Sequence, residues 1–518
     1  MNTHASSVYY DPYSPEISAN PYPVFRRLRE EAPLYYNKEH DFYAVSLYED
    51  VERGLFDRET FISGRGAILE LIKANAEFPP GILIFEDPPI HTAHRAMLAR
   101  MFTPKRLNGL EAKVRDYCAQ CLDPLVGSDN FDLIAELGGK MPMRVIGMLL
   151  GIPEEDQAAV KNLVDDSIRT ESGKPMEFVL SNYSGEAFED YIDWRAKHPS
   201  DDVMTEMLNA EFKDETGTVR KLARQEMLTL INVLAGAGNE TTTRLIGWTG
   251  KVLAEHPDQR RQLVEDPTLI PQGIEEILRF EPPPPHIARY VNRDVEVRGQ
   301  TIPKGSVMMF LVGSANRDER CFPDGDRFDI NRTLTKRHLT FGYGVHTCLG
   351  AVLARLEGRV ALEELLKRFP YWDVDLDRAR LSPTSTVRGW ETLPIYTRPG
   401  IRPSTSKARP ETAVQDNQQP VTLDGTWNVT VKSPTGPMAT VLALEYVDGR
   451  LTGTQSGQGT TTPISDIQID GNQITWINHI SKPMKMKLTF SGTVSGKEMS
   501  GKVKAGFMGS FQFTGVKA

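Results

Sequence analysis

Apolar side chains recur at helical spacing along the first 398 residues of the chain. The segments RAMLARMF, RVIGMLLGI and ALEELLKRF show this spacing clearly, and each predicts a helix with a buried face. The pattern changes near residue 400. From residue 423 onward, apolar and polar positions alternate over short segments, as at Trp427, Val429 and Val431, and pairs such as Ser495-Gly496 separate these segments. This alternation predicts β-strands joined by tight turns.

A segment of different composition separates the two patterns. Residues 399–422 are polar, contain several prolines and include almost no large apolar side chain, which is typical of a flexible linker. We therefore expect a mainly α domain over residues 1–398, a linker over residues 399–422, and a small all-β, barrel-like domain over residues 423–518.

Composition narrows the class of protein without identifying it. The chain has 518 residues, of which 40% are hydrophobic and 25% are charged, as in ordinary globular proteins. Four cysteines are too few for a disulfide scaffold, and a net charge of −9 gives no general attraction to nucleic acid. The N-terminus has no basic segment followed by an apolar run, and no window approaches the ~20 apolar residues of a membrane-spanning helix. We expect a cytoplasmic protein without a membrane anchor.

The segment with the clearest chemical content is FGYGVHTCLG, residues 341–350, which precedes a predicted helix. Cys348 lies just before this helix, where the helix dipole and free backbone N–H groups stabilise a thiolate. The three glycines allow the backbone to approach a flat ligand closely, and Phe341 can shield the sulfur. These features fit a thiolate bound to a metal macrocycle. The alternatives are a structural cysteine and a nucleophile with His346 as its base, although the loop has no carboxylate to orient His346.

The pattern F-G-x-G-x-H-x-C-x-G resembles the haem-binding signature of the cytochrome P-450 family, and every fixed position is filled. The resemblance extends over residues 10 to 398, and further motifs occur in the order of the family. It implies the cytochrome P-450 fold, which is mainly α with small β-sheets. It also implies a haem b cofactor whose iron is bound by Cys348, with Phe341, His346 and Gly350 in the same cofactor-binding loop.

A second motif lies inside the apolar segment LTLINVLAGAGNETTTRLIGW, which predicts a long buried helix. Gly236 and Gly238 weaken the middle of this helix, and threonine hydroxyls compete for its carbonyl groups, so the helix can open around a small ligand. By resemblance, Thr241 stabilises the reduced oxygen and Glu240 helps to relay protons. Without the resemblance, Glu-Thr-Thr would be interpreted as an ordinary solvated helix face.

Other residues match the family in its haem-side core. Glu276 and Arg279 have i, i+3 spacing on a predicted helix, and by resemblance they form a structural pair. The two haem propionates need cationic or donor partners, and the matching positions are His91, Arg95, Arg289 and His346. His94 is out of register with the family, and we expect it at the surface. We interpret Cys118, Cys121 and Cys321 as packing residues.

The positions that line the substrate pocket in the family are mostly apolar in this chain, which predicts a hydrophobic substrate. They are Ile82, Leu83, Ile84, Leu234, Ala237, His286, Ile287, Thr386 and Val387. A steroid, a terpenoid, a fatty acid or an aromatic compound each fits this set. The small side chain of Ala237 favours a bulky ligand.

The resemblance implies a monooxygenase that hydroxylates a hydrophobic small molecule with O2 and two electrons. The sequence contains no dinucleotide-binding fingerprint, flavin domain or ferredoxin cysteine cluster. We therefore expect electrons from a separate ferredoxin, itself reduced by an NAD(P)H-dependent ferredoxin reductase. The hypothesis includes a basic docking patch for an acidic ferredoxin, made of Arg100, Lys105, Arg106, Lys336 and Arg337.

Two alternative functions remain open at this point. One is a peroxide-driven peroxygenase with the same fold, against which the Glu240-Thr241 pair argues, because dioxygen activation needs a proton relay. The other is a non-catalytic protein that binds haem or a hydrophobic ligand, with the C-terminal domain as its working part. That domain begins Gly425-Thr426-Trp427 and resembles lipocalin-like barrels in this motif and in its strand spacing. Its apolar strand faces favour a plain core over a ligand cavity.

Overall fold

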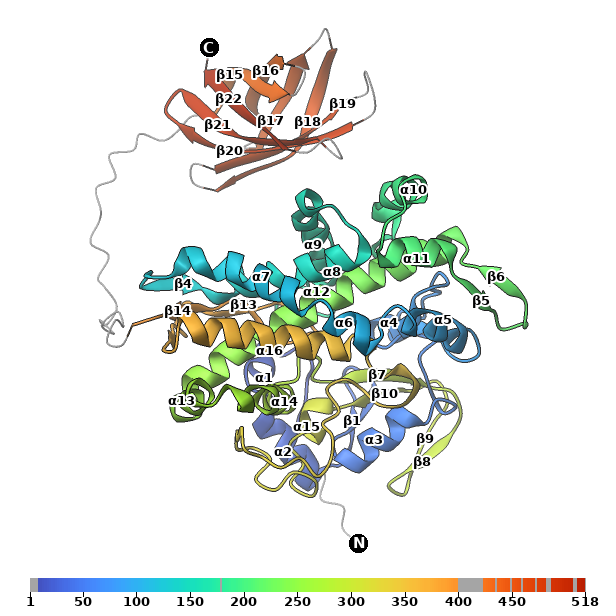
Figure 1. Cartoon of the computed structure of the whole chain (residues 1–518). Coiled ribbons are helices and arrows are strands. Elements are labelled where there is room, and N and C mark those ends of the chain that lie inside the picture. Colours follow the sequence, from blue (N-terminus) through green and yellow to red (C-terminus); the bar gives the residue numbers. More distant parts are fainter. Residues whose placement is uncertain are drawn as a thin grey trace. The chain divides into compact units, whose positions relative to one another are not determined.

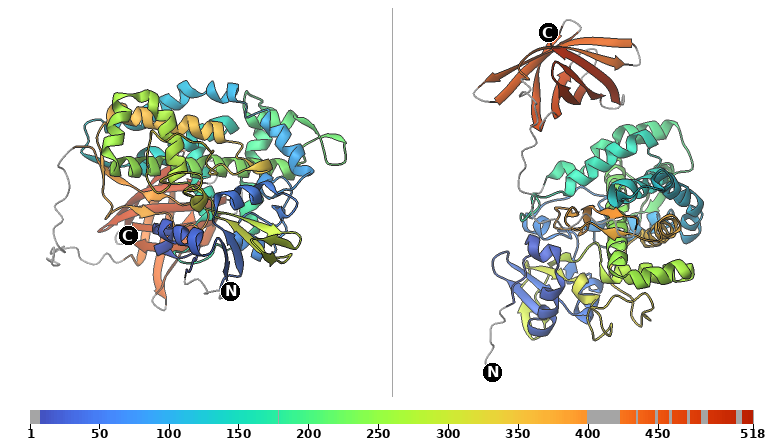
Figure 2. Two further views of the ribbon diagram at one scale, coloured as in Figure 1. Left: turned by 90° about the horizontal axis from the view of Figure 1, so that it is seen from below. Right: turned by 90° about the vertical axis from the view of Figure 1, so that its left-hand side faces the viewer.

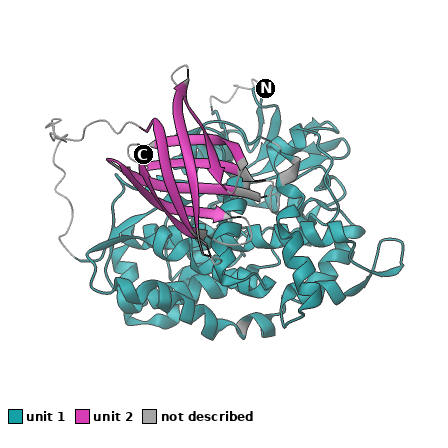
Figure 3. Ribbon diagram, turned by 90° about the horizontal axis from the view of Figure 1, so that it is seen from above, with its two compact units in different colours: residues 1–404 teal, residues 405–518 magenta. Residues whose placement is uncertain are grey.

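The computed structural model describes residues 8–177, 179–398, 423–433, 436–447, 450–457, 460–470, 473–480, 486–505 and 510–517. The chain divides into two compact units, residues 1–404 and 405–518 (Figure 3). The predicted linker, residues 399–422, lies outside the described residues. The first unit is mainly α with small β-sheets and the second is all-β, so the predicted fold class is confirmed.

The helices of the first unit surround one long central helix, α12 (Figure 1). They are α1 (Pro15–Ala19), α2 (Tyr22–Glu31), α3 (Tyr48–Phe56), α4 (Leu69–Lys73), α5 (Ile90–Ala99), α6 (Pro104–Asn108), α7 (Glu111–Leu122), α8 (Met141–Leu150), α9 (Glu154–Ile168), α10 (Glu189–Lys197), α11 (Val203–Asn209), α12 (Arg224–Glu255), α13 (Pro257–Glu265), α14 (Ile270–Phe280), α15 (Val312–Ala315) and α16 (Ala351–Arg368).

The strands of the first unit form several small sheets. They are β1 (Leu34–Asn37), β2 (Phe42–Val45), β3 (Phe61–Ile62), β4 (Asn130–Asp132), β5 (Glu211–Lys213), β6 (Val219–Lys221), β7 (Ile287–Val291), β8 (Val295–Val297), β9 (Gln300–Ile302), β10 (Val307–Phe310), β11 (Asp373–Val374), β12 (Arg380–Leu381), β13 (Trp390–Thr392) and β14 (Pro394–Tyr396). The largest sheet has the order β1-β2-β10-β7-β3, and only its β2–β10 pair is parallel. Figures 1 and 2 show this sheet and α3 on one side of the helical part.

The core of the helical part is built on α12, which packs against α8, α9, α14 and α16. Small residues allow these close approaches. A Cβ added at Gly238 would lie 2.7 Å from Ile146 on α8, and one added at Gly250 would lie 2.3 Å from Leu133. Burial of apolar faces on all sides of the helix supplies most of the stabilisation. The helix therefore has a fixed position across the first unit, which matters because it forms one wall of the site described below.

The pair Glu276 and Arg279 lies on α14 and is completely buried. The Arg279 Nε and Nη2 atoms donate to the two Glu276 carboxylate oxygens, each at 2.7 Å. The same guanidinium donates to the carbonyl oxygens of Asn316 at 2.8 Å and Gly325 at 2.7 Å. The pair thus ties α14 to the long segment that precedes the cysteine loop.

The second unit is a closed barrel of eight antiparallel strands in sequential order, in which β15 pairs with β22. Its strands are β15 (Gly425–Ser433), β16 (Gly436–Val447), β17 (Arg450–Gly457), β18 (Thr460–Asp470), β19 (Gln473–Ile480), β20 (Met486–Ser495), β21 (Glu498–Ala505) and β22 (Ser510–Lys517). Gly496, at φ 61°, occupies the predicted turn between β20 and β21, where a left-handed conformation favours glycine.

Large aromatic side chains fill the interior of the barrel. Trp476 stacks on Phe490 with ring centroids 4.6 Å apart, and Phe513 meets both rings edge-on. The Trp476 Nε1 atom donates to Gln455 Oε1 at 3.1 Å, and Asn478 donates to the same oxygen at 3.2 Å. The buried polar groups of this interior are therefore hydrogen-bonded to one another.

Two remaining sequence predictions concern packing and membranes. Cys118 and Cys121 are buried on α7, and burial raises the pKa of both thiols, so neither favours a thiolate. Cys321 is half-buried. Among the described residues, no helix is both long enough and apolar enough to cross a membrane.

Candidate functional site

The cysteine loop has a defined conformation that brings Cys348 to the N-terminus of α16. The Cys348 backbone N–H donates to the carbonyl oxygen of Phe341 at 2.8 Å, which closes the loop. Gly342 and Gly344 have φ angles of 70° and 75°, a region that favours glycine. A Cβ at Gly344 would also lie 2.9 Å from the carbonyl oxygen of Leu55, so glycine is needed there for both reasons.

The thiol of Cys348 faces a cavity instead of packing in a core. Burial raises its pKa, while the backbone N–H of Gly350 and the guanidinium groups of Arg95 and Arg355 lower it, and the sum is a raised pKa. The expected stabilisation by the helix N-terminus is therefore present but is outweighed by burial. Cys348 is exposed to this cavity, where a bound metal ion would stabilise its thiolate.

The cavity has a volume of about 290 Å³ and lies between Cys348 and α12. Apolar side chains from α12, η1 (Leu83–Phe85), α16 and the start of β7 form most of its surface. Its lining includes Leu83, Ile84, Phe102, Ile146, Val233, Leu234, Ala237, Thr241, Leu245, Leu278, Ile287, Phe341, Cys348 and Leu353. Such a lining binds flat or bulky apolar groups in preference to polar ones.

Thr241 lies on the α12 wall of this cavity. Its hydroxyl donates to the carbonyl oxygen of Ala237 at 2.8 Å, one turn earlier in the helix. A threonine hydroxyl bonded in this way replaces part of the helical hydrogen bonding and can be exchanged for a small polar ligand or a water molecule. Thr241 and Cys348 therefore line the same cavity, Thr241 from α12 and Cys348 from the loop before α16.

Four donor side chains meet at the edge of the cavity near the cysteine loop. The rings of His91 on α5 and His346 lie 4.2 Å apart, and Arg95 donates to the carbonyl oxygen of Thr347. Arg289 on β7 is buried, and it donates to the neighbouring carbonyl oxygen of Ala288 at 2.8 Å. The structure thus brings together all four residues that the sequence predicts to bind propionates.

Buried polar groups of this cluster lack hydrogen-bond partners within the described part of the chain. Among the described residues, neither His91 ring nitrogen nor the His346 Nε2 atom has a hydrogen-bond partner, although all three are buried. Burial is the main cause that lowers the pKa of His91 to about 4, of His346 to about 3 and of Arg289 to about 10, and neighbouring cations contribute for both histidines. Buried donors without partners are costly. Two carboxylates of a bound haem would satisfy them, so the residues present fit this cofactor.

Glu240 does not face the same cavity as Thr241. Successive residues of a helix point about 100° apart, and Glu240 lines a second, polar cavity of about 100 Å³ on the other side of α12. Its carboxylate accepts from Arg244 at 2.7 Å. Burial raises the pKa of Glu240, and Arg244 offsets part of this effect. Glu240 is therefore not among the residues that line the main cavity.

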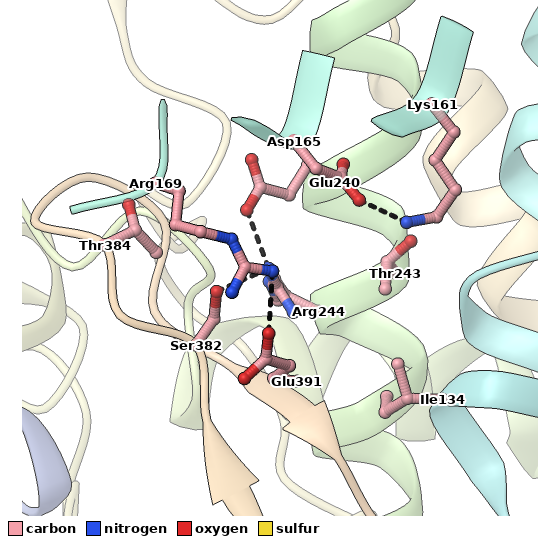
Figure 4. Close-up of a pocket in the computed structure, with 10 residues that line it drawn as sticks. All are labelled: Ile134, Lys161, Asp165, Arg169, Glu240, Thr243, Arg244, Ser382, Thr384 and Glu391. Atoms are coloured by element: carbon pink, nitrogen blue, oxygen red, sulfur yellow. Dashed lines mark hydrogen bonds and ion pairs between the residues drawn. The ribbon is translucent and has the colours of Figure 1, made fainter. Parts of the chain in front are cut away.

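Charged side chains from three segments surround this polar cavity (Figure 4). Arg169 forms an ion pair with Glu391 at 2.7 Å, and Lys161 pairs with Asp165 on α9. The lining residues are Ile134, Lys161, Asp165, Arg169, Glu240, Thr243, Arg244, Ser382, Thr384 and Glu391. Three cations and three carboxylates are thus held next to α12, directly behind Thr241.

The predicted substrate pocket is reproduced only in part. Leu83, Ile84, Leu234, Ala237 and Ile287 line the main cavity, whereas Ile82, His286, Thr386 and Val387 do not. Ile82 is buried in a separate apolar cluster with Leu71, Phe85 and Met176. His286 is turned toward the N-terminal segment, where the Tyr10 hydroxyl lies 3.3 Å from its Nδ1 atom. Thr386 is turned toward its own loop, where its hydroxyl lies 3.0 Å from that of Thr384.

The prediction for His94 is wrong. The side chain is completely buried, and its ring lies between the carboxylates of Glu86 and Glu226. The sequence offered one signal, the short i, i+8 separation from Glu86, but the partner on α12 is distant in the chain. Glu357 on α16 is a further residue that the motifs do not indicate. It lines the main cavity and is completely buried, and burial raises the pKa of its carboxyl group well above the usual value.

A mainly α fold, a cysteine at a helix N-terminus facing an apolar cavity, and donors for two carboxylates define a haem-thiolate protein. Comparison with known proteins leads to the same class. The sequence model of the cytochrome P450 family matches residues 176–386. Cytochrome P450 130 of Mycobacterium tuberculosis is 34% identical over 392 residues, which cover 72% of this chain and 94% of that protein. The chain belongs to the cytochrome P450 family; it is a monooxygenase and binds haem b.

Other relatives extend this similarity. The vitamin D(3) 25-hydroxylase of Pseudonocardia autotrophica is 34% identical over 403 residues, which cover 76% of this chain and 98% of that protein. The solved structure of cytochrome P450 CYP109Q5 from Chondromyces apiculatus is 35% identical with a TM-score of 0.66, and the match covers 75% of this chain and 97% of that one. These matches cover three quarters of the chain, the share expected if they correspond to the first unit alone.

Proposed function

We propose that the protein hydroxylates a hydrophobic small molecule with O2 and two electrons delivered by a separate ferredoxin and an NAD(P)H-dependent ferredoxin reductase. One observation carries the proposal: a largely apolar cavity is lined by both Cys348 and Thr241. A bound haem supplies oxygen activation, in which one oxygen atom of O2 enters a C–H bond and the other leaves as water. The family usually takes its electrons from ferredoxin partners.

In this proposal residues 1–398 form the haem domain, residues 399–422 the linker and residues 423–518 an appended barrel. Cys348 holds the iron, while Phe341 and Gly350 shape the loop around the sulfur. The unpartnered donors at the cavity edge support the assignment of His91, Arg95, Arg289 and His346 to the two propionates. Because burial already keeps the two imidazoles neutral, they act as hydrogen-bond donors and the two arginines supply the positive charge.

Glu240 and Thr241 divide the delivery of protons between two sides of α12. Glu240 takes up a proton from the polar cavity, where burial raises the pKa of its carboxyl group and Arg244 opposes this effect. Thr241 holds a proton or a water molecule in the main cavity, since its bond to the Ala237 carbonyl leaves the hydroxyl oxygen free to accept. Gly236 and Gly238 weaken α12 just before these two residues. The helix can therefore open enough for a water molecule to connect the polar cavity with the main cavity.

The apolar lining supports a substrate from the steroid, terpenoid, fatty acid or aromatic classes. Relatives point to more than one of these classes. The vitamin D(3) 25-hydroxylase is named above, and a structure of CYP109E1 from Bacillus megaterium, 29% identical with a TM-score of 0.67, is in complex with testosterone. Both are compounds with rigid apolar rings, which also suit the small Ala237 side chain in the wall.

Four of the five residues proposed for the docking patch are exposed, whereas the charge of the fifth is partly neutralised by ion pairs. Arg100, Lys105, Lys336 and Arg337 are exposed. Arg106 differs, because it forms ion pairs with Asp201 and Glu206 and so contributes less attraction. Arg337 lies 4.0 Å from the ring centroid of Tyr343 in the cysteine loop. An acidic ferredoxin bound there would approach Cys348 from the loop side.

The experiment that tests the proposal is reconstituted turnover. The purified full chain is screened with steroids, terpenoids, fatty acids and aromatic compounds for a Soret shift, which reports displacement of water from the iron. Compounds that shift the band are then incubated with a ferredoxin, its reductase and NADH. We expect a hydroxylated product that requires all three. Product formed with hydrogen peroxide but not with ferredoxin and NADH would favour the peroxygenase, and binding without any product would favour a non-catalytic protein.

A further inference from the structure

His94 lies on α5 with both ring nitrogens facing carboxylates. Its Nδ1 atom is 2.9 Å from Glu86 Oε2, and its Nε2 atom is 3.4 Å from Glu226 Oε1. The three residues come from three segments: α5, the residue after η1, and the first turn of α12. His94 is 0% exposed, so this contact lies entirely within the protein.

Each carboxylate has further partners that fix its position. Glu226 accepts from the Arg220 guanidinium at 2.6 and 2.8 Å and from the backbone N–H of Ala223 at 2.7 Å. Burial raises the pKa of Glu226, but Arg220, the Ala223 N–H and His94 outweigh it and hold the pKa below the usual value. Glu86 Oε1 accepts from the backbone N–H of Gly81 at 2.8 Å. Glu226 is therefore ionised at neutral pH and cannot donate to His94.

The surroundings of the ring leave it no other polar partner among the described residues. Phe212 on β5 meets it edge-on with centroids 5.3 Å apart, and Arg220 on β6 lies 4.7 Å over the same phenyl ring. The charged groups nearby are therefore Glu86, Glu226 and Arg220, and Asp214 pairs with Arg220 at 3.1 Å. The Nδ1 atom is hydrogen-bonded to Glu86, whereas Nε2 approaches Glu226 without forming a hydrogen bond.

Burial of such a cluster is expensive, and an apolar side chain would stabilise the fold at least as well. A buried ionic cluster can instead favour one arrangement of the segments that it connects. Here the connected segments include η1, which forms part of the cavity wall. Glu86 directly follows η1, whose Leu83 and Ile84 line the main cavity. The same loop has one other side-chain bond to α12, from the Thr229 hydroxyl to the carbonyl oxygen of Pro80 at 2.6 Å.

We propose that His94 is a positioning residue that fixes the Leu83–Ile84 wall of the substrate cavity against α12. The wall is a short 3-10 turn and cannot hold its own position, so the bonds at Gly81, Glu86 and Pro80 determine where its side chains lie. This inference rests on the proposed function in one respect, namely that the main cavity is the substrate site. His94 touches neither the cavity nor the cysteine loop, and it acts through Glu86.

The test uses the full-length haem-loaded protein and the variant His94→Gln, which keeps a polar side chain but removes the imidazole ring that contacts Glu86 and Glu226. Hydrogen exchange is measured on a peptide covering residues 81–86. Binding of imidazole and of 4-phenylimidazole is measured by difference spectroscopy. Imidazole needs only the iron, while the phenyl group of the larger probe must contact the cavity wall. We expect exchange at residues 81–86 to accelerate at least about tenfold and the ratio of the two Kd values to change at least about fivefold.

Three further variants separate positioning from simple loss of stability. His256→Gln removes another half-buried imidazole, which packs on Phe328 away from the cavity, and should leave both readouts within about twofold. His94→Gln combined with Glu86→Gln removes the unpaired charge and should restore exchange toward the parent value. Glu226→Gln breaks one contact while it keeps the imidazole, and it replaces His94→Gln if that variant fails to bind haem.

The outcomes are decisive in either direction. Parent-like exchange and an unchanged Kd ratio in both His94→Gln and Glu226→Gln would overturn the proposal. So would equal effects of His256→Gln, or the absence of any recovery in the double variant, since the cause would then be general destabilisation. None of these readouts depends on turnover. A protein that binds both probes but oxidises nothing would contradict the proposed function and leave the role of His94 standing.

Discussion

At the scale of single residues, the site contains polar groups that are unfavourable in the protein alone and that a bound cofactor would stabilise. The raised pKa of Cys348 and the unpartnered nitrogens of His91 and His346 are unfavourable in the protein alone. A bound haem reverses both costs, because the iron stabilises the thiolate and the propionates accept from the donors. Binding of the cofactor should therefore also stabilise the fold.

Thr241→Ala tests the proposed role of the Thr241 hydroxyl in proton delivery. The variant loses the hydroxyl that accepts and donates in the main cavity, while Ala237 and the apolar lining stay in place. We expect product formed per NADH to fall about tenfold or more, with the lost electrons recovered as hydrogen peroxide, and substrate affinity to stay within about twofold. Thr243→Ala, which faces the polar cavity, is the control. If the two variants formed the same amount of product per NADH, the proposed role of Thr241 would be excluded.

We expect His286 to make the free energy of unfolding sensitive to acid. Burial lowers its pKa from the ordinary 6.5 to about 4, so the folded state binds its proton only below the range in which the unfolded state does. Its contribution is complete above pH 6.5 and is lost as the pH falls through about 4, and it amounts to ~3 kcal/mol at most. Urea unfolding at pH 7 and pH 4.5 should show a smaller difference in His286→Gln than in the parent. Identical pH dependence would contradict the assignment.

At the scale of elements, several segments are held by buried side-chain bonds to loops without regular structure. Arg279 on α14 is the clearest case, since it bonds Glu276 and the carbonyl oxygens of Asn316 and Gly325 at once. His94 has the same character on α5, where it joins η1 to α12. Both arrangements connect a helix to a loop through buried polar side chains.

Arg279→Leu should therefore destabilise the first unit strongly. The variant leaves Glu276 buried with fewer partners, and loss of one member of a buried pair costs ~3–5 kcal/mol. Chemical unfolding followed by far-ultraviolet circular dichroism measures this difference in the free energy of unfolding. Arg327→Leu is the matched control, because its pair with Asp329 is exposed and should contribute less than ~1 kcal/mol. Similar losses in the two variants would refute the structural role of Arg279.

Element-level patterns explain which parts of the site the sequence could predict. The cysteine loop and the residues proposed to bind the propionates follow local motifs, so the sequence alone is enough to propose Cys348, His346 and Arg289 as site residues. Rotation about α12 separates Glu240 from Thr241, and the motif carries no information on what lies behind the helix. His94 cannot be placed in this way because Glu226 is far away in the chain, and the side chains of Thr386 and His286 depend on loop conformations that apolar spacing does not determine.

At the scale of the whole molecule, each unit has its own hydrophobic core. The barrel core, which includes Trp427, Trp476 and Phe490, contains only residues of the second unit, and the cores around α12 contain only residues of the first. The curated relatives correspond in length to the first unit. Independent folding of the two units is the physical consequence.

Separate expression tests this independence. Residues 1–404 alone should bind haem. They should unfold within about 2 °C of the temperature at which the same unit, here called the first transition, unfolds in the full chain. Residues 405–518 alone should unfold cooperatively. Calorimetry of the two fragments and the full chain provides the comparison. A fall of the first transition by more than about 5 °C on removal of the barrel would show that the second unit stabilises the first.

The central claim is that Cys348 binds haem iron as a thiolate, and the carbon monoxide difference spectrum of the reduced full chain tests it most directly. We predict the strongly red-shifted Soret band that thiolate ligation produces, and its loss in Cys348→Ser. A Soret band at the shorter wavelength typical of histidine-ligated haem in freshly prepared parent protein, or a band unchanged in Cys348→Ser, would contradict the account.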